Sequence, residues 1–224
     1  MNQPMSMRFA AIVAGAFLVS ASMGVQAQAP VGDVKAGETK AAMCIGCHGI
    51  VGYQNSFPEV HKVPKISGQS AAYIVSALTA YKKNERKHPS MRGIATSLSE
   101  QDMADLAAFY SGHAGNVTAA DTPSKAASVQ VAALLEKGAC ASCHGANFSK
   151  PIDPSYPKLA GQHADYLYVA LKSYTVKDNH VIGRGNPIMG GTVQQFKLSE
   201  LKQMANYLGS LNGELKTVPQ SSFR

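Results

Sequence analysis

Only four cysteines occur among the 224 residues of the chain, and tryptophan is absent. All four cysteines fall in two short motifs, so none is left over for a disulfide framework. No segment shows the alternating pattern of a β-strand, and beyond the N-terminus no run is apolar enough to span a bilayer. The sequence also has no phosphate-binding loop, no nucleophile–base arrangement and no supported carboxylate pair. These absences argue against a β-rich fold and against the common hydrolase and nucleotide-binding classes.

The N-terminus has the three regions of a secretory signal peptide. Arg8 precedes an uncharged run over residues 9–25, which leads into the small residue Ala27. We therefore predict a signal peptide over residues 1–27, with cleavage after Ala27 or, as a second choice, after Ala29. The alternative is an uncleaved membrane anchor. Export would place the mature chain in the periplasm.

The two cysteine motifs both have the form Cys-x-x-Cys-His. Two thiols separated by two residues can add to the two vinyl groups of one haem, and the adjacent histidine can bind the iron from below. We therefore predict two covalently bound haem c groups. The residues are Cys44, Cys47 and His48 in the first motif and Cys140, Cys143 and His144 in the second.

Two other interpretations of these motifs are weaker. A redox-active dithiol needs no histidine directly after it and would lie in a βαβ pattern, which is absent. Two Cys-x-x-Cys pairs could together bind zinc, but such pairs are usually closer in sequence than these.

The cysteine motifs belong to a longer internal repeat. Each is followed by a hexad that begins Pro-Lys and ends Gly-Gln, at residues 64–69 and 157–162. Apolar residues then recur at helical spacing, and Leu-Ser-Glu opens a later helix in both copies, with Ser99 and Ser199 as caps. The predicted helices cover residues 73–81 and 99–110 in the first copy and residues 128–138, 166–174 and 199–211 in the second.

The repeat predicts an all-α fold with two tandem domains, each wrapped around one covalently bound haem. The first domain covers residues 28–113 and the second covers residues 125–224. A linker rich in Ala, Gly, Thr and Pro joins them over residues 114–124. We expect the tail after Gly213 to be loosely ordered. Domains this small would need the haem to complete their cores.

Methionine is the predicted sixth ligand of each iron. Met91 and Met189 occur in matched Pro-x-Met-x-Gly segments, which we interpret as extended loops that turn the sulfur inward. Histidine is the rival ligand, but no histidine outside the haem motifs recurs at matched positions, and we interpret these as surface residues. They are His61, His88, His113, His163 and His180.

Pro64 and Pro157 open the two hexads. A proximal imidazole usually donates its second N–H to a carbonyl, which fixes the ring and tunes its basicity. A carbonyl from each hexad could accept this bond, although a plain turn proline is an equally good interpretation.

The formal net charge is +7, and it is unevenly distributed. Residues 28–123 have a net charge of +1, whereas residues 124–224 have a net charge of +5. The second half, with Lys172, Lys177 and Lys202, is therefore a candidate docking face for an acidic redox partner, and it also allows peripheral association with anionic lipid. Nucleic acid is a poor partner because no basic–aromatic motif is present.

Together, the haem motifs, the hexads and the methionine segments resemble those of the dihaem cytochromes c4. Each half resembles a class I cytochrome c, including the Gly-Asp-Val-x-x-Gly opening at residues 32–37. The resemblance implies two cytochrome c folds about a pseudo-twofold axis, with haem propionates facing each other across the interface. It implies Met91 and Met189 as axial ligands and Pro64 and Pro157 as partners of the proximal histidines.

The resemblance also implies a function. It indicates a periplasmic electron carrier, loosely associated with the membrane, that delivers electrons towards a terminal oxidase of the respiratory chain. The alternative is a dihaem electron-accepting subunit of a dehydrogenase, such as a flavocytochrome that oxidises a sulfur compound. A dihaem peroxidase is a third hypothesis, but two irons closed by methionine leave peroxide no place to bind. We therefore predict that the protein is not an enzyme.

Overall fold

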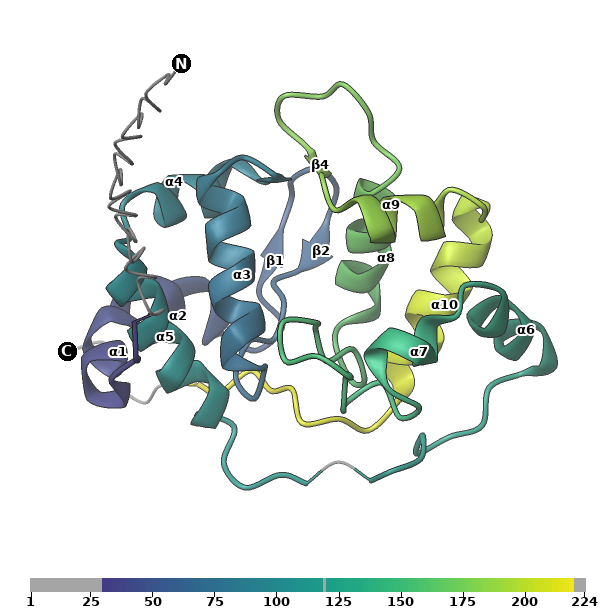
Figure 1. Cartoon of the computed structure of the whole chain (residues 1–224), viewed down its shortest axis with the longest axis horizontal. Helices are drawn as coiled ribbons and strands as arrows, with labels where there is room; N and C mark the ends of the chain where they lie inside the picture. Colours follow the sequence, from purple (N-terminus) through teal and green to yellow (C-terminus); the bar gives the residue numbers. More distant parts are fainter. Residues whose placement is uncertain (1–29, 119, 220–224) are drawn as a thin grey trace, which may run out of the picture.

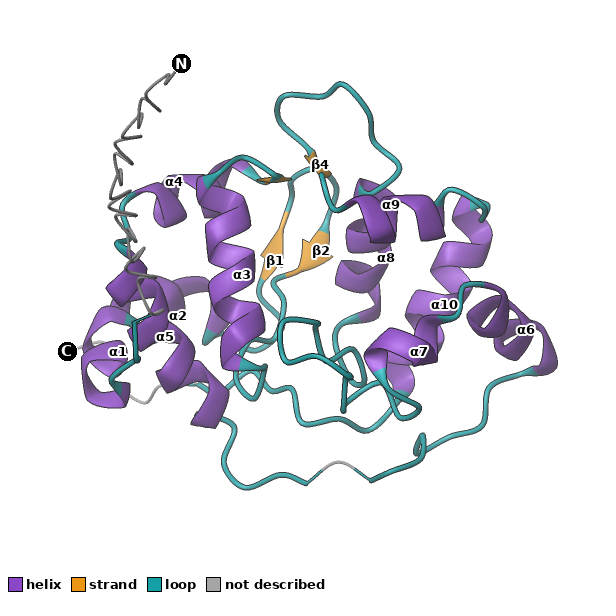
Figure 2. Ribbon diagram, in the orientation of Figure 1, coloured by secondary structure: helices purple, strands orange, loops and turns teal. Residues whose placement is uncertain are grey.

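The structure is a computed structural model that describes residues 30–118 and 120–219. The predicted signal peptide, residues 1–27, lies outside this part of the chain. Two groups of helices lie side by side, with short strands between them (Figure 1, Figure 2). The predicted arrangement of two mainly helical domains is therefore confirmed. No helix within the described ranges has both the length and the apolar character needed to cross a membrane.

Each domain contributes five helices to the described part of the chain. The first domain contains α1 (Val34–Lys40), α2 (Ala42–His48), α3 (Ala71–Lys82), α4 (Pro89–Thr96) and α5 (Glu100–Gly112). The second contains α6 (Val129–Lys137), α7 (Cys140–His144), α8 (Ala164–Ser173), α9 (Pro187–Val193) and α10 (Leu198–Ser210).

The last long helix of each domain carries most of its core. Helix α5 buries an apolar stripe at helical spacing, as the sequence predicts, and α3 packs against it. Helix α10 does the same in the second domain, where it packs on α6 and α8. The buried residues of the two stripes are Met103, Leu106, Ala107 and Tyr110 in α5, and Leu201, Met204, Ala205 and Leu208 in α10.

One of the two predicted helix caps is present. The Ser99 hydroxyl accepts a hydrogen bond from the N–H of Asp102 at 3.1 Å, while the Asp102 carboxylate accepts from the Ser99 N–H at 2.9 Å. This is a capping box. The prediction that Ser199 caps the second helix is wrong, because α10 begins at Leu198 and Lys197 is the capping residue. The backbone N–H of Lys197 donates to the Glu200 carboxylate at 2.7 Å.

Four two-residue strands contradict the expectation that the chain has no strands. Strand β1 (Gln54–Asn55) pairs with β2 (His61–Lys62) inside a long loop of the first domain. Strand β3 (Arg86–Lys87) pairs in antiparallel fashion with β4 (Gly183–Arg184), so this ribbon takes one strand from each domain. A two-residue strand is too short to show alternation in a sequence.

Two glycines of the opening motif explain how α1 approaches α5. A Cβ atom on Gly32 would lie 2.1 Å from the carbonyl oxygen of Ala104, and one on Gly37 would lie 2.1 Å from that of Asp105. These distances are far below van der Waals contact, so a larger residue would push the helices apart.

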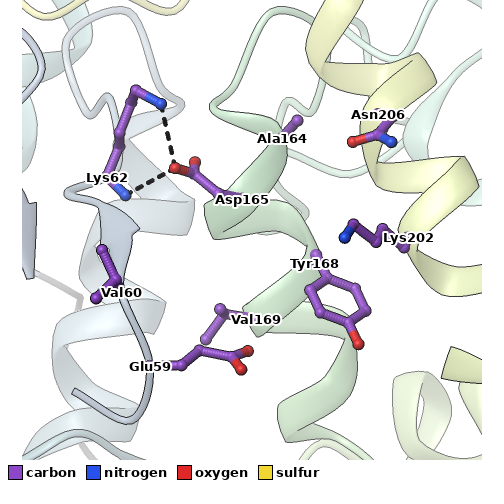
Figure 3. Close-up of a pocket in the computed structure, with 9 residues that line it drawn as sticks. All are labelled: Glu59, Val60, Lys62, Ala164, Asp165, Tyr168, Val169, Lys202 and Asn206. Carbon is purple, nitrogen blue, oxygen red and sulfur yellow. Dashed lines mark hydrogen bonds and ion pairs between the residues drawn. The ribbon is translucent and has the colours of Figure 1, made fainter. Parts of the chain in front are cut away.

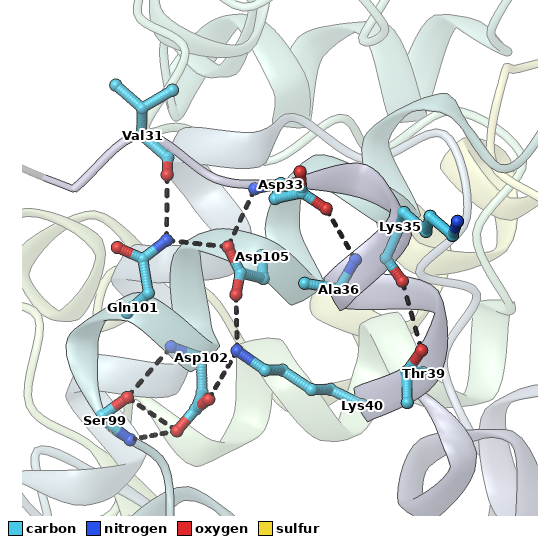
Figure 4. A network of polar contacts seen from close by, with 10 residues as sticks. All are labelled: Val31, Asp33, Lys35, Ala36, Thr39, Lys40, Ser99, Gln101, Asp102 and Asp105. Carbon is cyan, nitrogen blue, oxygen red and sulfur yellow. Dashed lines mark hydrogen bonds and ion pairs between the residues drawn. The ribbon is translucent and has the colours of Figure 1, made fainter.

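A polar network around Asp105 fixes α1 on the same helix (Figure 4). The Asp105 carboxylate accepts from the backbone N–H of Asp33 at 2.8 Å and from Lys40 Nζ at 2.5 Å. The side-chain amide of Gln101 also donates to it at 2.8 Å, and Lys40 reaches Asp102 at 2.7 Å. Both ends of α1 are thereby attached to one face of α5.

The segment after α10 returns to the first domain. Leu215 is buried, and the backbone N–H of Lys216 donates to the carbonyl of Ser67 at 3.0 Å. Glu214 forms an ion pair with Lys158. The expectation of a loosely ordered tail is therefore wrong for these residues, which connect the two halves of the molecule.

Candidate functional site

The first Cys-x-x-Cys-His motif forms most of α2. Cys44 packs against the core of the first domain, whereas Cys47 is exposed. Burial raises the pKa of the Cys44 thiol. The motif therefore presents one sulfur from the core side and one from the solvent side of the same short helix.

His48 ends this helix with its ring already oriented. Its Nδ1 lies 2.8 Å from the carbonyl oxygen of Pro64. A carbonyl can only accept, so Nδ1 donates and the lone pair of the ring is on Nε2. Burial lowers the pKa of His48, which favours this neutral form. A neutral imidazole with a free Nε2 is the form that binds iron.

The second motif repeats this arrangement. Helix α7 holds all five of its residues, and Cys140 packs against the core of the second domain. His144 is buried, and its Nδ1 donates to the carbonyl oxygen of Pro157 at 3.0 Å. Burial also lowers the pKa of this histidine.

The four cysteines do not converge on one zinc site. They lie in two helices of two different domains, and none is paired in a disulfide. Within residues 30–118 and 120–219, no three side chains of His, Cys, Asp or Glu gather closely enough to hold a metal ion.

The two methionines occupy corresponding positions in short helices. Met91 lies in the first turn of α4 and Met189 in the first turn of α9, so the expectation of extended loops is wrong. Proline is the first residue of both helices, where its missing N–H costs nothing. Both methionine side chains are half-buried, and Met189 packs against the core of the second domain.

His88 lies beside Met91, and the ring of His61 lies 6.5 Å from that of His88. His88 caps α4, and its Nδ1 accepts from the backbone N–H of Met91 at 3.5 Å. His61 is buried, with Nδ1 2.8 Å from the carbonyl of Glu59, so its interpretation as a surface residue is wrong.

The remaining histidines lie elsewhere. His113 has Nδ1 3.0 Å from the hydroxyl of Ser67, and His163 directly precedes α8. Burial is the main reason that the pKa of His163 falls to about 4. His180 is exposed in a loop.

Two arginines meet where the domains join. Arg86 and Arg184 face each other in the β3–β4 register, and neither has a carboxylate partner among the described residues. Both guanidinium groups donate to the hydroxyl of Tyr166, at 2.6 Å and 3.2 Å. Arg86 also donates to Tyr73 at 3.1 Å, and Arg184 lies over the ring of Tyr174.

No carboxylate among the described residues forms an ion pair with either of these like charges. Burial alone would raise the pKa of Tyr166, but the two guanidinium charges outweigh it and lower the pKa to about 8. The Arg86 Nε is buried without a hydrogen-bond partner among the described residues. Like charges directly opposite in a ribbon are destabilising, so the geometry fits an anion at this place.

The sequence contains a signal for this pair that the prediction missed. Each arginine precedes its methionine by five residues, so the repeated segment is Arg-x-x-Pro-x-Met-x-Gly in both copies. These arginines donate to the hydroxyls of Tyr73 and Tyr166, the first residues of the predicted helices over residues 73–81 and 166–174.

The two hexads also meet across the interface. Gln162 Oε1 accepts from the backbone N–H of Lys65 at 2.9 Å, and its Nε2 donates to the Lys65 carbonyl at 2.8 Å. Gln69 forms the same two bonds with Lys158, at 2.9 Å and 3.1 Å. Both glutamines are 4% exposed. The reciprocity gives the interface a pseudo-twofold symmetry.

A charged groove runs along another part of this interface (Figure 3). The ion pairs Lys62–Asp165, at 3.2 Å, and Lys172–Glu59, at 2.8 Å, connect the domains there. Lys172, one of the lysines of the predicted docking face, is thus paired with a carboxylate of the first domain. None of the predicted haem ligands lines the groove, whose residues are Glu59, Val60, Lys62, Ala164, Asp165, Tyr168, Val169, Lys202 and Asn206.

Comparison with known proteins identifies related chains with two cytochrome c domains. The cytochrome c family model matches residues 34–112 and 128–212. A cytochrome c4 of Thiocapsa roseopersicina is 35% identical over 84% of this chain and 98% of that protein. A thiosulfate dehydrogenase electron acceptor of Thiomonas intermedia is 29% identical over 86% of this chain and 89% of that protein.

A solved structure has the same fold. The crystal structure of reduced cytochrome c4 from Pseudomonas stutzeri aligns with 81% of this chain and 100% of that chain, at 25% identity and a TM-score of 0.57. The chain therefore belongs to the dihaem cytochrome c4 family, whose members are electron carriers rather than enzymes and hold two covalently bound haem c groups.

Proposed function

We propose that each Cys-x-x-Cys-His motif binds one haem and that both irons are closed by methionine. The observation that carries this proposal is the matched pair of histidines, each with Nδ1 bonded to a proline carbonyl and Nε2 left for iron. The thioether positions are Cys44, Cys47, Cys140 and Cys143, the axial ligands are His48, Met91, His144 and Met189, and the orienting carbonyls belong to Pro64 and Pro157.

The residues that would surround the two haems have different roles. When bound, each haem c supplies one-electron exchange between ferric and ferrous iron. The proline carbonyls hold the imidazole rings in one orientation and tautomer. Methionine is a soft, neutral ligand that raises the reduction potential and leaves no position for a substrate. This arrangement supports electron transfer and disfavours substrate chemistry.

Arg86 and Arg184 are suited to hold haem propionates. They form a cationic pair between the domains that has no carboxylate partner within residues 30–118 and 120–219, and the buried Nε of Arg86 has no acceptor there. Planar guanidinium groups bind carboxylates with two parallel hydrogen bonds. The propionates are carboxylates that both haems bring to the molecule, and they would remove the charge imbalance.

In the cell, we propose a periplasmic carrier of the respiratory chain, exported by the signal peptide over residues 1–27. Delivery towards a terminal oxidase remains the leading proposal. The alternative, electron acceptance from a sulfur-oxidising dehydrogenase, is supported by the relative named as an electron acceptor of thiosulfate dehydrogenase. Copurification with a dehydrogenase subunit would favour the role of electron acceptor. Rapid oxidation of the reduced protein by oxidase-containing membranes, without a copurifying subunit, would favour delivery to a terminal oxidase.

We also retain the proposed division of the chain into domains over residues 28–113 and 125–224, with residues 114–124 as the linker. The family matches, over residues 34–112 and 128–212, fall within these two units and support it.

Carbon monoxide binding tests the ligand assignment. We expect the reduced wild-type protein to bind no carbon monoxide at either haem, because methionine fills both sixth positions. Met91→Ala and Met189→Ala should each open one iron and bind one equivalent, measured by absorption spectroscopy. Met103→Leu, a change in the core of the first domain, is the matched control. Carbon monoxide binding by the wild-type protein would refute the closed-iron proposal.

A further inference from the structure

Each predicted proximal histidine is connected to the other domain through a single peptide group. The carbonyl of Pro64 accepts from His48 Nδ1 at 2.8 Å, and the N–H of the same peptide belongs to Lys65. That N–H donates to Gln162 Oε1 at 2.9 Å. The path from the first domain's histidine to the second domain's glutamine therefore contains only two hydrogen bonds and one peptide.

The same path exists in the opposite direction. The carbonyl of Pro157 accepts from His144 Nδ1 at 3.0 Å, and the N–H of that peptide, on Lys158, donates to Gln69 Oε1 at 2.9 Å. Both glutamines are 4% exposed, so water does not compete for their bonds. The second bond of each glutamine, to the lysine carbonyl, holds the side-chain amide in place.

A peptide that donates at its N–H becomes a better acceptor at its carbonyl. Hydrogen bonds in a chain polarise one another, by roughly 10–30% per bond in condensed phases. A stronger carbonyl acceptor pulls the Nδ1 proton and makes the imidazole a more electron-rich ligand. An electron-rich ligand favours ferric iron and lowers the reduction potential.

We propose that domain docking tunes each haem through this path, with Gln162 as a positioning residue for the first haem and Gln69 for the second. The inference rests on the proposed function, because it requires His48 and His144 to bind iron. It assigns the glutamine that ends each hexad a role in the opposite domain.

Redox titration of Gln162→Leu and Gln69→Leu tests the proposal. Gln162→Leu should raise the potential of the first haem, with about a threefold change in its reduction equilibrium, or about 28 mV, and leave the second nearly unchanged. Gln69→Leu should do the reverse. Haem methyl resonances in NMR spectra, assigned with a Met189→His variant, follow the two haems separately.

Ser70→Ala is the matched control. The Ser70 hydroxyl donates a neutral hydrogen bond to the carbonyl of Pro154 across the same interface. The backbone N–H of Ser70, which donates to Gln69 Oε1 at 3.0 Å, is retained in the alanine variant. Its two potentials should equal those of the wild type. If Gln162→Leu fails to fold, Gln162→Met removes the same bonds with an unbranched side chain of similar length.

Three results would overturn the proposal. They are unchanged potentials in both glutamine variants, equal shifts at both haems, and an equal shift in Ser70→Ala, which would indicate a loosened interface. The carbon monoxide experiment reports separately on the methionine ligands. The ligand assignment and the peptide path can therefore fail independently.

Discussion

At the scale of single residues, Arg86 and Arg184 carry the most information that the sequence analysis did not use. Their repeat position five residues before each methionine is visible in the sequence. What the sequence does not show is that a two-residue ribbon sets them opposite each other. Lysine and arginine are ordinarily solvated surface residues, so a charge becomes informative only when its neighbours are known.

Replacing Arg86 by Gln should lower both reduction potentials. Reduction adds negative charge at the haem, so a nearby positive charge favours the ferrous state. Loss of this charge should shift the ferric–ferrous equilibrium of each haem towards the ferric state by about tenfold. Spectroelectrochemical titration measures the shift. Lys83→Gln removes the same charge from an exposed position in the same domain and should change it far less. Equal shifts in the two variants would show that Arg86 acts only through net charge.

At the scale of elements, the attachment of α1 to α5 depends on Asp105. Its side chain is 3% exposed, yet it is charged and accepts three hydrogen bonds. The backbone N–H of Asp33, followed by Lys40 and Gln101, lowers the pKa of Asp105 to about 2. A buried carboxylate in this position acts as the anchor for a whole helix.

The stability of the protein should therefore fall in acid. Because the folded pKa of Asp105 is about 2 and the unfolded value is about 3.9, its contribution is complete above about pH 4 and disappears as the pH falls towards 2. Asp105→Asn should be less stable at pH 7 and lose less stability over that range, measured by denaturant unfolding. Asp178→Asn, in an exposed loop, is the control. An unchanged acid slope in Asp105→Asn would contradict the assignment.

Long helices with a regular apolar pattern could be predicted from the sequence, whereas short helices and strands could not. The apolar residues over 73–81 and 166–174 predicted α3 and α8 because nine residues are enough to show a helical period. Helices α4 and α9 have eight and seven residues, open with proline and contain glycine, so their pattern matches a loop as well as a helix. The ribbon of β3 and β4 pairs Arg86 with Arg184, which are 98 residues apart in the sequence, and no local pattern reveals such a pair.

Some residues of the candidate site could likewise be predicted from the sequence, and others could not. The haem motifs, the methionines and the hexad prolines are visible because each recurs in a matching short motif in both copies. The roles of Gln69 and Gln162 cannot be read from the sequence, although both glutamines occur at matching positions of the two hexads. Each acts on the opposite copy, so its partner follows only from the way the two domains pack.

At the scale of the whole molecule, each domain has a modest core, and one cysteine of its haem motif, Cys44 or Cys140, packs against that core. Domains of about 90–100 residues bury limited apolar area by themselves. A covalently held group that fills the space between helices would therefore contribute directly to folding.

Removal of the haem attachment sites should unfold the protein. The variant with all four cysteines replaced by serine should lose its cooperative thermal transition, followed by near-ultraviolet circular dichroism. Cys44→Ser combined with Cys47→Ser should retain one haem per chain and one folded domain. A cooperative transition in the fourfold variant would show that the polypeptide folds without the haem.

The contacts between the two halves are of a kind that two separate chains could also form. Each half supplies one edge strand and one glutamine and receives the same set in return. Two separate copies of such a half would form the same bonds about a true twofold axis, as an isologous homodimer. Joining the copies makes the contact intramolecular, so it persists at any dilution. The halves differ in net charge, +1 and +5, although the contacts between them are the same in both directions.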